Sequence, residues 1–335
     1  MKKFMILCTA AILLIATAAD LRAAVVIKIG SVAPARSPWD RALQEVAREW
    51  EKISGGQVQV KIYPGGIAGS EMDMIRKIRL GALQGGVFTN MGITKIERSV
   101  LVLNLPFMFD SQEEFEFVFD RMKSVFEKEI EDKGFKVILW TLAGWVHFFA
   151  KDPVIYPDDL KKHKVSVTQG DPELEQIWKR SGFQVVPGDI KDLMVQLQSG
   201  AVGASYLPAL VAGSGQYFAL TPHMLSMTLA PLVGGMFISE RTWQSIPREF
   251  HQPMMDAVER ISRDLYEQIM DLEKEALVTM KDHGLVVHDP PDDAMAKWRA
   301  VSAQGIEDLV GRAFPKPVYD AMIGHIREYR KNRGR

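Results

Sequence analysis

The sequence of 335 residues has a single cysteine, Cys8, which lies inside an apolar N-terminal segment. Without further thiols the rest of the chain forms no disulfide framework and no cysteine-based metal or redox site. Its length nevertheless allows a core large enough to fold without cross-links. The seven histidines form no H-x-H, HExxH or mixed Cys/His pattern. We therefore predict neither a metal site nor a cofactor.

The sequence also lacks an excess of basic charge. If the chain is cleaved after Ala23, loss of Lys2, Lys3, Arg22 and Asp20 leaves 38 basic and 41 acidic residues. Proteins that bind nucleic acid present a basic face, which attracts the phosphate backbone. The charge balance therefore argues against nucleic acid as a partner.

Residues 1–23 have the pattern of a cleavable secretion signal. Two lysines precede an apolar run, Phe4–Ala19, which is too short for a stable membrane span. Cleavage after Ala18 and cleavage after Ala23 both fit the small residues there, and the sequence does not decide between them. No later segment is apolar for long enough to cross a bilayer. We expect export to the periplasm.

Strand-like and helix-like patterns alternate at the start of the mature chain. The ranges 25–32 and 58–63 are rich in β-branched residues and predict strands. Ser37 followed by Pro38 is typical of a helix start, and 72–83 predicts a second helix. This alternation predicts an α/β fold with a mainly parallel sheet covered by helices.

A second α/β unit is predicted to begin near Lys151. Its predicted elements are strands at 164–168 and 183–186 and helices at 172–181 and 190–199. We expect the chain to return to the first unit near 234–239. A long helix follows at 247–283, with amphipathic helices at about 291–311 and 316–330.

Short motifs in a fixed order resemble the DctP-like family of TRAP transporter periplasmic receptors. The motifs lie at Ile27–Pro34 with Ser37–Trp39, at Ile62–Glu71, Ile78–Leu83, Leu103–Phe109, Asp158–Pro208 and Phe237–Ser239 with Trp243. Each is weak alone, but their order over most of the chain makes a chance match implausible. The resemblance implies a two-lobed periplasmic-binding-protein fold with a hinge and an interdomain ligand cleft.

The same resemblance divides the chain. It implies a signal peptide at 1–23, lobe I at 24–148 plus 234–262, and lobe II at 149–233 plus 285–335. The helix at 247–283 would bridge both lobes. Such a receptor closes on its ligand, presents a surface to a membrane permease and performs no chemistry, so we predict that the chain is not an enzyme.

Four positions depart from the family pattern. Ser166 stands where the family's strand carries an arginine, which clamps a substrate carboxylate through paired charge-assisted hydrogen bonds. Val146 replaces a second basic residue, Leu207 replaces an asparagine, and Ile190 replaces an aromatic residue. An enclosed carboxylate without a cationic partner would cost several kcal/mol in desolvation.

We therefore predict a site that takes a neutral or largely hydrophobic solute. The predicted apolar contacts are Phe88, Trp145, Val146, Ile190, Tyr206 and Leu207. The predicted uncharged polar contacts are Thr89, Asn90, Ser166 and Thr168. Strand alternation places Ser166 and Thr168 on one face.

Other interpretations stay open. Val146 and Leu207 are also compatible with core positions, and an organic anion could be held by a non-standard cationic anchor. A receptor that has lost ligand binding, or one that docks to a helical-repeat partner in the periplasm, also fits the sequence. An exported hydrolase would require an activated serine, but no G-x-S-x-G motif occurs.

Overall fold

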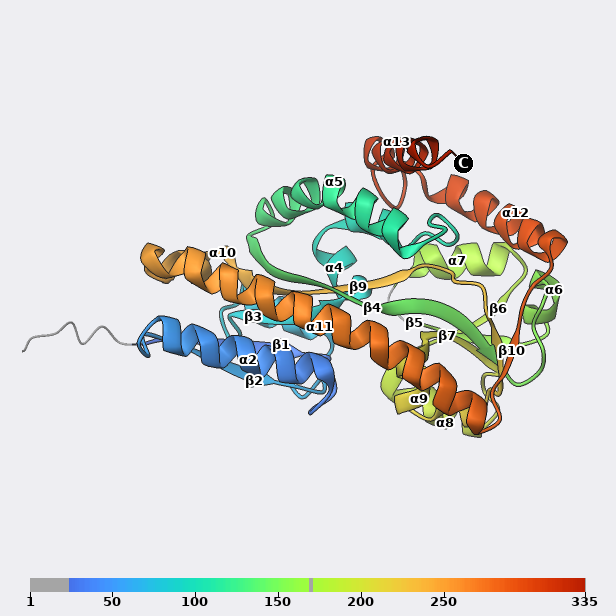
Figure 1. The fold of residues 1–335 in the computed structure, drawn as a ribbon, viewed down its shortest axis with the longest axis horizontal. Coiled ribbons are helices and arrows are strands. Elements are labelled where there is room, and N and C mark those ends of the chain that lie inside the picture. Colours follow the sequence, from blue (N-terminus) through green and yellow to red (C-terminus); the bar gives the residue numbers. More distant parts are fainter. Residues whose placement is uncertain (1–23, 169–170, 335) are drawn as a thin grey trace, which may run out of the picture.

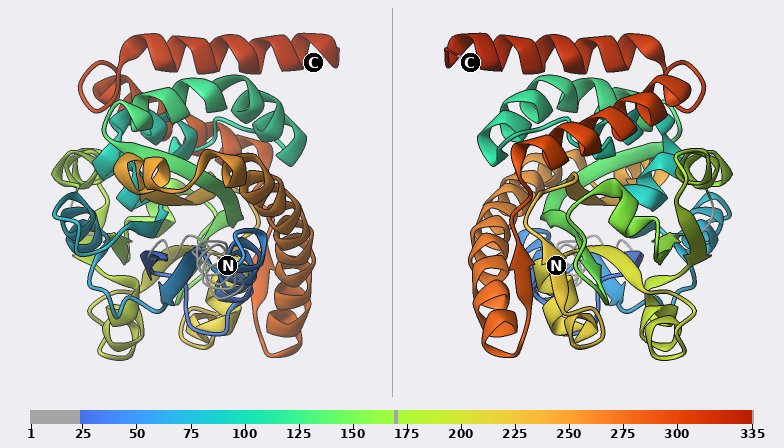
Figure 2. Two further views of the ribbon diagram at one scale, coloured as in Figure 1. Left: turned by 90° about the vertical axis from the view of Figure 1, so that its left-hand side faces the viewer. Right: turned by 90° about the vertical axis from the view of Figure 1, so that its right-hand side faces the viewer.

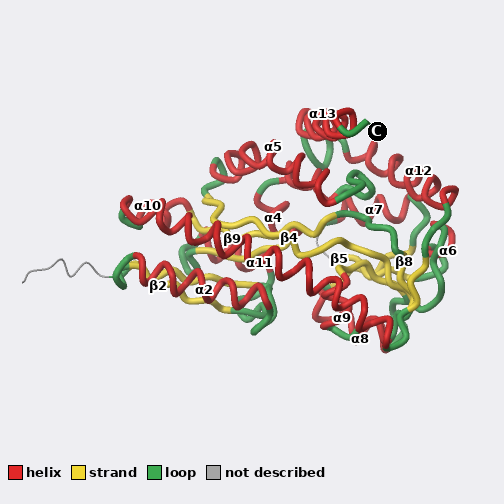
Figure 3. Tube along the Cα trace, in the orientation of Figure 1, coloured by secondary structure: helices red, strands yellow, loops and turns green. Residues whose placement is uncertain are grey.

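The computed structural model describes residues 24–168 and 171–334, so the predicted signal peptide lies outside the described residues. A layer of strands runs through the molecule and helices cover both of its faces (Figure 3). The strands are β1 Val25–Ser31, β2 Val58–Tyr63, β3 Gly85–Thr89, β4 Phe135–Ala150, β5 Lys164–Thr168, β6 Gln184–Gly188, β7 Ala204–Pro208, β8 His223–Leu225, β9 Pro231–Ser239 and β10 Val286–His288.

The helices follow the alternation that the sequence predicts. They are α2 Pro38–Ile53, α3 Glu71–Arg79, α4 Asn90–Ile96, α5 Gln112–Glu131, α6 Pro157–Leu160, α7 Pro172–Arg180, α8 Leu193–Gln198, α9 Ala209–Ser214, α10 Glu240–Ser245, α11 Arg248–Asp282, α12 Asp292–Leu309 and α13 Lys316–Asn332. Short 3₁₀ helices lie at η1 Arg98–Asn104, η2 Ile190–Asp192 and η3 Tyr217–Ala219.

Two predicted helices are shorter than expected. The helix predicted at 72–83 ends at Arg79, because Gly81 takes a left-handed conformation with φ of 78°. The helix predicted at 190–199 begins with the 3₁₀ turn η2, and regular α-helix starts only at Leu193.

Strand β4 joins two halves of the sheet. Its first part, up to Trp145, pairs antiparallel with β9, and Val146–Ala150 pairs antiparallel with β7. Strands β2, β1, β3 and β9 lie on one side of this junction, and β7, β5 and β6 lie on the other. We refer to these halves and their helices as lobe I and lobe II. The residue ranges predicted for the lobes stay a prediction.

Helix α11 connects the lobes. It packs against α2 in lobe I, against β4, and against α9 in lobe II. Figure 1 shows it running diagonally along the molecule from α10 to α9. The sequence predicted this helix at 247–283, and the structure places it at Arg248–Asp282. The two-lobed α/β fold with a long lobe-spanning helix is thus confirmed.

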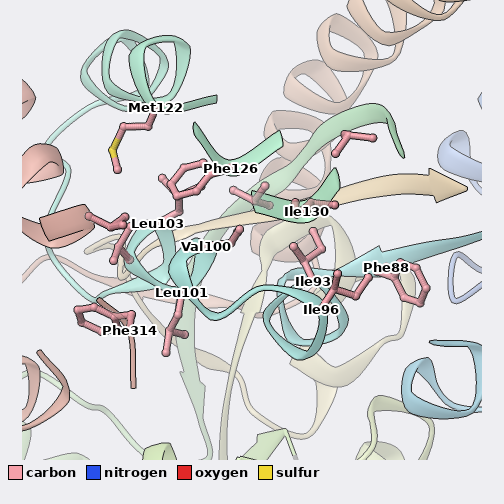
Figure 4. Packing of buried hydrophobic residues seen from close by; sticks show 14 of the residues in the cluster. Phe88, Ile93, Ile96, Val100, Leu101, Leu103, Met122, Phe126, Ile130 and Phe314 are labelled. Atoms are coloured by element: carbon pink, nitrogen blue, oxygen red, sulfur yellow. The ribbon is translucent and has the colours of Figure 1, made fainter. Parts of the chain in front are cut away.

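Each lobe has its own core. The lobe I cluster contains Phe88, Ile93, Phe126 and Phe135, all at most 1% exposed (Figure 4). The lobe II cluster is centred on Phe148, which stacks on Trp298 with ring centroids 5.2 Å apart.

The C-terminal helices contact both lobes. Helix α12 packs on α6 and α7, and α13 packs on α5, above which it lies in Figure 2. In the described part of the chain, no helix combines the length and the apolar character needed to span a membrane.

Candidate functional site

The carboxyl ends of strands from both lobes meet beside the β4 junction. Strand β3 ends at Thr89 opposite Gly234, which pairs in turn with Thr141 of β4. Strand β7 ends at Pro208 opposite Val146, only five residues further along β4. In open α/β sheets, ligands bind in the crevice outside the carboxyl ends of the strands. We therefore expect the ligand site where the two lobes face each other.

On the lobe I side, Thr89 caps helix α4, and its hydroxyl accepts a hydrogen bond from the Met91 N–H. The Glu71 carboxylate accepts hydrogen bonds from the Thr89 N–H at 2.6 Å and from the Thr89 hydroxyl at 3.1 Å. Burial raises the pKa of Glu71 to about 7, and the negative charge of Asp189 in lobe II adds to this shift. Glu71 and Asp189 thus bring acidic groups to the facing ends of the two lobes. Asn90 begins α4 and is half-buried.

On the lobe II side, Tyr206 and Thr168 form one polar contact. The Tyr206 ring stacks on Trp178 with centroids 5.8 Å apart. Burial raises the pKa of the Tyr206 hydroxyl, and hydrogen bonds with the Thr168 backbone and side chain oppose that shift. Thr168 itself is exposed at the end of β5. Val165 and Val167 are buried in the lobe II core, so the predicted alternation along β5 is confirmed.

Ser166 pairs with a residue that the sequence analysis missed. Its hydroxyl donates to Oε1 of Gln196 on α8 at 3.2 Å. Gln196 is half-buried, and it lies three residues after the buried Leu193 and next to the buried Leu197. The sequence offered one indication of this role: a polar side chain lies next to the apolar residues of the helix that are buried.

Three predicted apolar contacts lie in or against the packed interior. Phe88 is 1% exposed in the lobe I core, and Val146 is 8% exposed in the lobe II core. Leu207 is half-buried and packs against two smaller clusters of lobe II. These placements favour the core interpretation that the sequence left open for Val146 and Leu207. Their contact with a ligand stays a prediction.

Trp145 and Ile190, two more of the predicted apolar contacts, differ in their surroundings. The Trp145 indole N–H donates to Oε1 of Gln112 at 2.6 Å, and its ring meets Phe115 edge-on. Ile190, by contrast, is 53% exposed beside Asp189. Thr89, Asn90, Thr168 and Tyr206 thus lie at or near the carboxyl ends of β3, β5 and β7, and Ser166 lies within β5. Trp145 and Val146 lie where β4 itself passes between the lobes.

Two basic residues of lobe I lie near the loop that follows β5. Arg98 on η1 pairs with Asp171 and, at 3.1 Å, with Glu173 of α7. Lys95 lies 3.7 Å from the same Asp171, which is only 3% exposed. These ion pairs connect lobe I to α7. The carboxylates of Asp171 and Glu173 thereby neutralise the charges of Lys95 and Arg98.

A further carboxylate fixes the long helix to lobe II. Glu273 on α11 accepts hydrogen bonds from the backbone N–H groups of Ala209 and Leu210 at 3.2 and 2.9 Å. Burial raises the pKa of Glu273 to about 7, although both hydrogen bonds favour the ionised form. The site where α11 holds α9 is therefore sensitive to protonation.

We expect this burial to make the protein less stable as the pH rises. Because the folded-state pKa of Glu273 lies above its ordinary value of 4.5, folding favours the protonated carboxyl. Its contribution to stability is fully present below about pH 4.5 and is lost as the pH rises through about 7. Between these pH values, the free energy of unfolding measured in urea should fall less in Glu273→Gln than in wild type, by on the order of 2 kcal/mol.

The matched control for that measurement is Glu275→Gln, which changes an exposed carboxylate on the same helix. It should leave the pH profile unchanged. The pKa of Glu71 is also raised, so its contribution to stability is likewise lost as the pH rises. The free energy of unfolding of Glu273→Gln should therefore still fall somewhat with pH. Identical profiles for wild type and Glu273→Gln would contradict the expected coupling.

A surface pocket of about 220 Å³ lies elsewhere, next to α12. Its lining residues are Phe107, Phe109, Asp110, Ser226, Met227, Thr228, Met295 and Arg299. None of the predicted site residues lines it. Within residues 24–168 and 171–334, no group of three His, Cys, Asp or Glu residues is arranged to hold a metal ion.

Comparison with known proteins accounts for this architecture. The DctP family model, described as bacterial extracellular solute-binding protein, family 7, matches residues 29–311. The chain belongs to this family. It is a TRAP-type periplasmic solute-binding receptor, and the family consists of receptors rather than enzymes. Receptors of this kind bind small ligands and work with membrane permease subunits.

Relatives in the DctP family cover most of the chain. A solute-binding protein of Chromohalobacter salexigens is 25% identical over 292 residues, which is 83% of this chain and 84% of that protein. The sialic acid-binding periplasmic protein SiaP of Vibrio cholerae is 24% identical over 299 residues, covering 84% and 88% respectively.

The fold also matches solved structures of the family. The TRAP periplasmic solute-binding protein of Roseobacter denitrificans, crystallised with bound β-D-glucuronate, superposes with a TM-score of 0.82. It is 19% identical, and the match covers 89% of this chain and 99% of that one. At this identity the likeness shows the shared fold.

Proposed function

We propose that this receptor closes on a neutral or largely hydrophobic small solute and delivers it to its membrane permease. The observation that carries the proposal is Ser166. At the strand position where the resemblance to the family implies a clamping arginine, this chain has an uncharged hydroxyl that hydrogen-bonds to an uncharged amide. A carboxylate enclosed there would lose its hydration without gaining a cation.

The charges around the lobe junction support the same proposal. Glu71 and Asp189 add acidic groups on the two sides of the junction, and neither can pair with an anionic ligand. Burial leaves Glu71 only partly ionised near neutral pH, and Lys191 pairs with Asp189 at 3.7 Å. The nearby cations Lys95 and Arg98 are already paired with Asp171 and Glu173. Desolvation would thus penalise an anion at this junction more than an uncharged solute.

One alternative has its own support. SiaP is named for sialic acid, and the Roseobacter structure holds glucuronate, so two similar proteins take acidic ligands. An organic anion could be held here by a non-standard anchor if Asp171 released Arg98. Substituting Arg98 should then abolish retention of that anion. Docking to a helical-repeat partner in the periplasm stays a further prediction.

Mass spectrometry of the purified mature protein tests the proposal. Spectra under native and denaturing conditions would reveal any solute that is released only on unfolding. We expect an uncharged or largely apolar compound. A stoichiometric dicarboxylate or sugar acid would overturn the proposed ligand class and leave the receptor assignment intact.

A further inference from the structure

The side chain of Gln196 reaches from α8 across the end of the lobe II sheet. Its Oε1 accepts the Ser166 hydroxyl on β5 at 3.2 Å. Its Nε2 lies against β6, where a Cβ placed on Gly188 would come within 2.5 Å of that nitrogen. A side chain at position 188 would displace this amide from its present position, so the glycine at the end of β6 permits the close approach.

The nitrogen end of this amide lies beside Gly188, at the carboxyl end of β6. Gly188 pairs with Thr168, whose own hydrogen bonds reach the Tyr206 hydroxyl. Gly188 also precedes Asp189, the residue whose charge acts on Glu71 of lobe I. The Gln196 amide therefore lies among the uncharged polar groups at the carboxyl ends of β5 and β6.

The hydrogen-bonding capacity of this amide is only partly used. An amide side chain has two N–H donors and one acceptor oxygen. Among the described residues, the acceptor is engaged by Ser166, and neither donor has a protein partner. A half-buried amide with two open donors at the carboxyl end of a sheet is suited to bind an oxygen of a ligand.

We propose that Gln196 is a specificity-determining residue that donates to an uncharged oxygen, a carbonyl or hydroxyl, of the bound solute. This inference rests on the proposed function, because a neutral donor suits a neutral acceptor. Ser166 fixes the amide by holding its oxygen, and the nitrogen lies beside Gly188 at the carboxyl end of β6. A carboxylate would gain from this amide none of the charge compensation that an arginine provides.

The test compares Gln196→Ala with Gln198→Ala, which removes an exposed amide from the same helix. Each protein is stripped of bound solute by unfolding, refolded, and incubated with a small-molecule extract of the producing cells. Native mass spectrometry then measures the mass and the amount retained. Thermal unfolding checks that all the variants refold to the wild-type midpoint within a few degrees.

We expect wild type and Gln198→Ala to retain the same neutral solute, and Gln196→Ala to bind it about three- to tenfold more weakly, as loss of one hydrogen bond predicts. Equal retention of a neutral solute by Gln196→Ala would overturn this inference and leave the proposed function standing. An anionic solute on wild type, or no solute at all, would overturn the proposed function and this inference with it.

Discussion

Arg98→Met should lower the free energy of unfolding by about 2–4 kcal/mol, because it leaves a buried carboxylate without its main partner. Arg98 holds three segments together: it pairs with Asp171 and Glu173 at the start of α7, and its Nε donates to the Ala313 carbonyl at 2.9 Å. Asp171 is only 3% exposed, so water cannot replace the lost guanidinium. Urea unfolding followed by tryptophan fluorescence measures the effect.

Arg180→Met is the matched control. Arg180, the last residue of α7, pairs with the Asp308 carboxylate at 3.3 Å, but these side chains are 56% and 46% exposed. Such a pair contributes at most about 1 kcal/mol. Equal losses in the two variants would show that the interlobe pairing at Arg98 adds no more than a surface ion pair.

Arg98→Met should also change the shape of the molecule. The ion pairs of Arg98 connect η1 to α7 across the lobes, so their loss should shift the population toward an open form. Small-angle scattering would record this as a larger radius of gyration at a pH and urea concentration where the variant is still folded. An unchanged radius would mean that other contacts alone hold the lobes together.

The sequence predicts best those helices and strands that bury only one face, because their apolar residues recur with a regular period. Strand 164–168 matches β5 because Val165 and Val167 alternate with less buried residues. The 16-residue strand β4 was not predicted. Both faces of the strand are buried at Val137–Leu139 and again at Val146–Ala150, so no period-2 pattern runs through the whole of Phe135–Ala150.

Only some residues of the candidate site could be predicted from the sequence. Phe88 lies in a strand of which both faces are buried, so the pattern could not separate a core position from a position at the cleft. Gln196 was missed because its role depends on Gly188 and Ser166, which lie on two other elements. Contacts between elements that are distant in the chain leave no periodic signal in a single sequence.

Gly144→Ala should cost about 2–4 kcal/mol of stability, through backbone strain and a steric clash. Gly144 has a φ of 108°, which L-residues rarely adopt, and it precedes the point where β4 passes from lobe I to lobe II. A Cβ there would lie 2.5 Å from Oε1 of Glu273 and 3.1 Å from Pro208. Displacing Glu273 would also release its hydrogen bonds to α9, so the junction itself should loosen.

Gly324→Ala separates this effect from the general consequence of replacing a glycine. Gly324 is exposed within α13, and a Cβ there would meet nothing within 4 Å. Alanine should therefore stabilise that helix by about 0.5–1 kcal/mol, the opposite sign to Gly144→Ala. If Gly144→Ala unfolded at the same urea concentration as wild type, β4 and α11 would have moved to accommodate the methyl group. The junction would then be adaptable, and closure of the lobes would not depend on a fixed backbone conformation at Gly144.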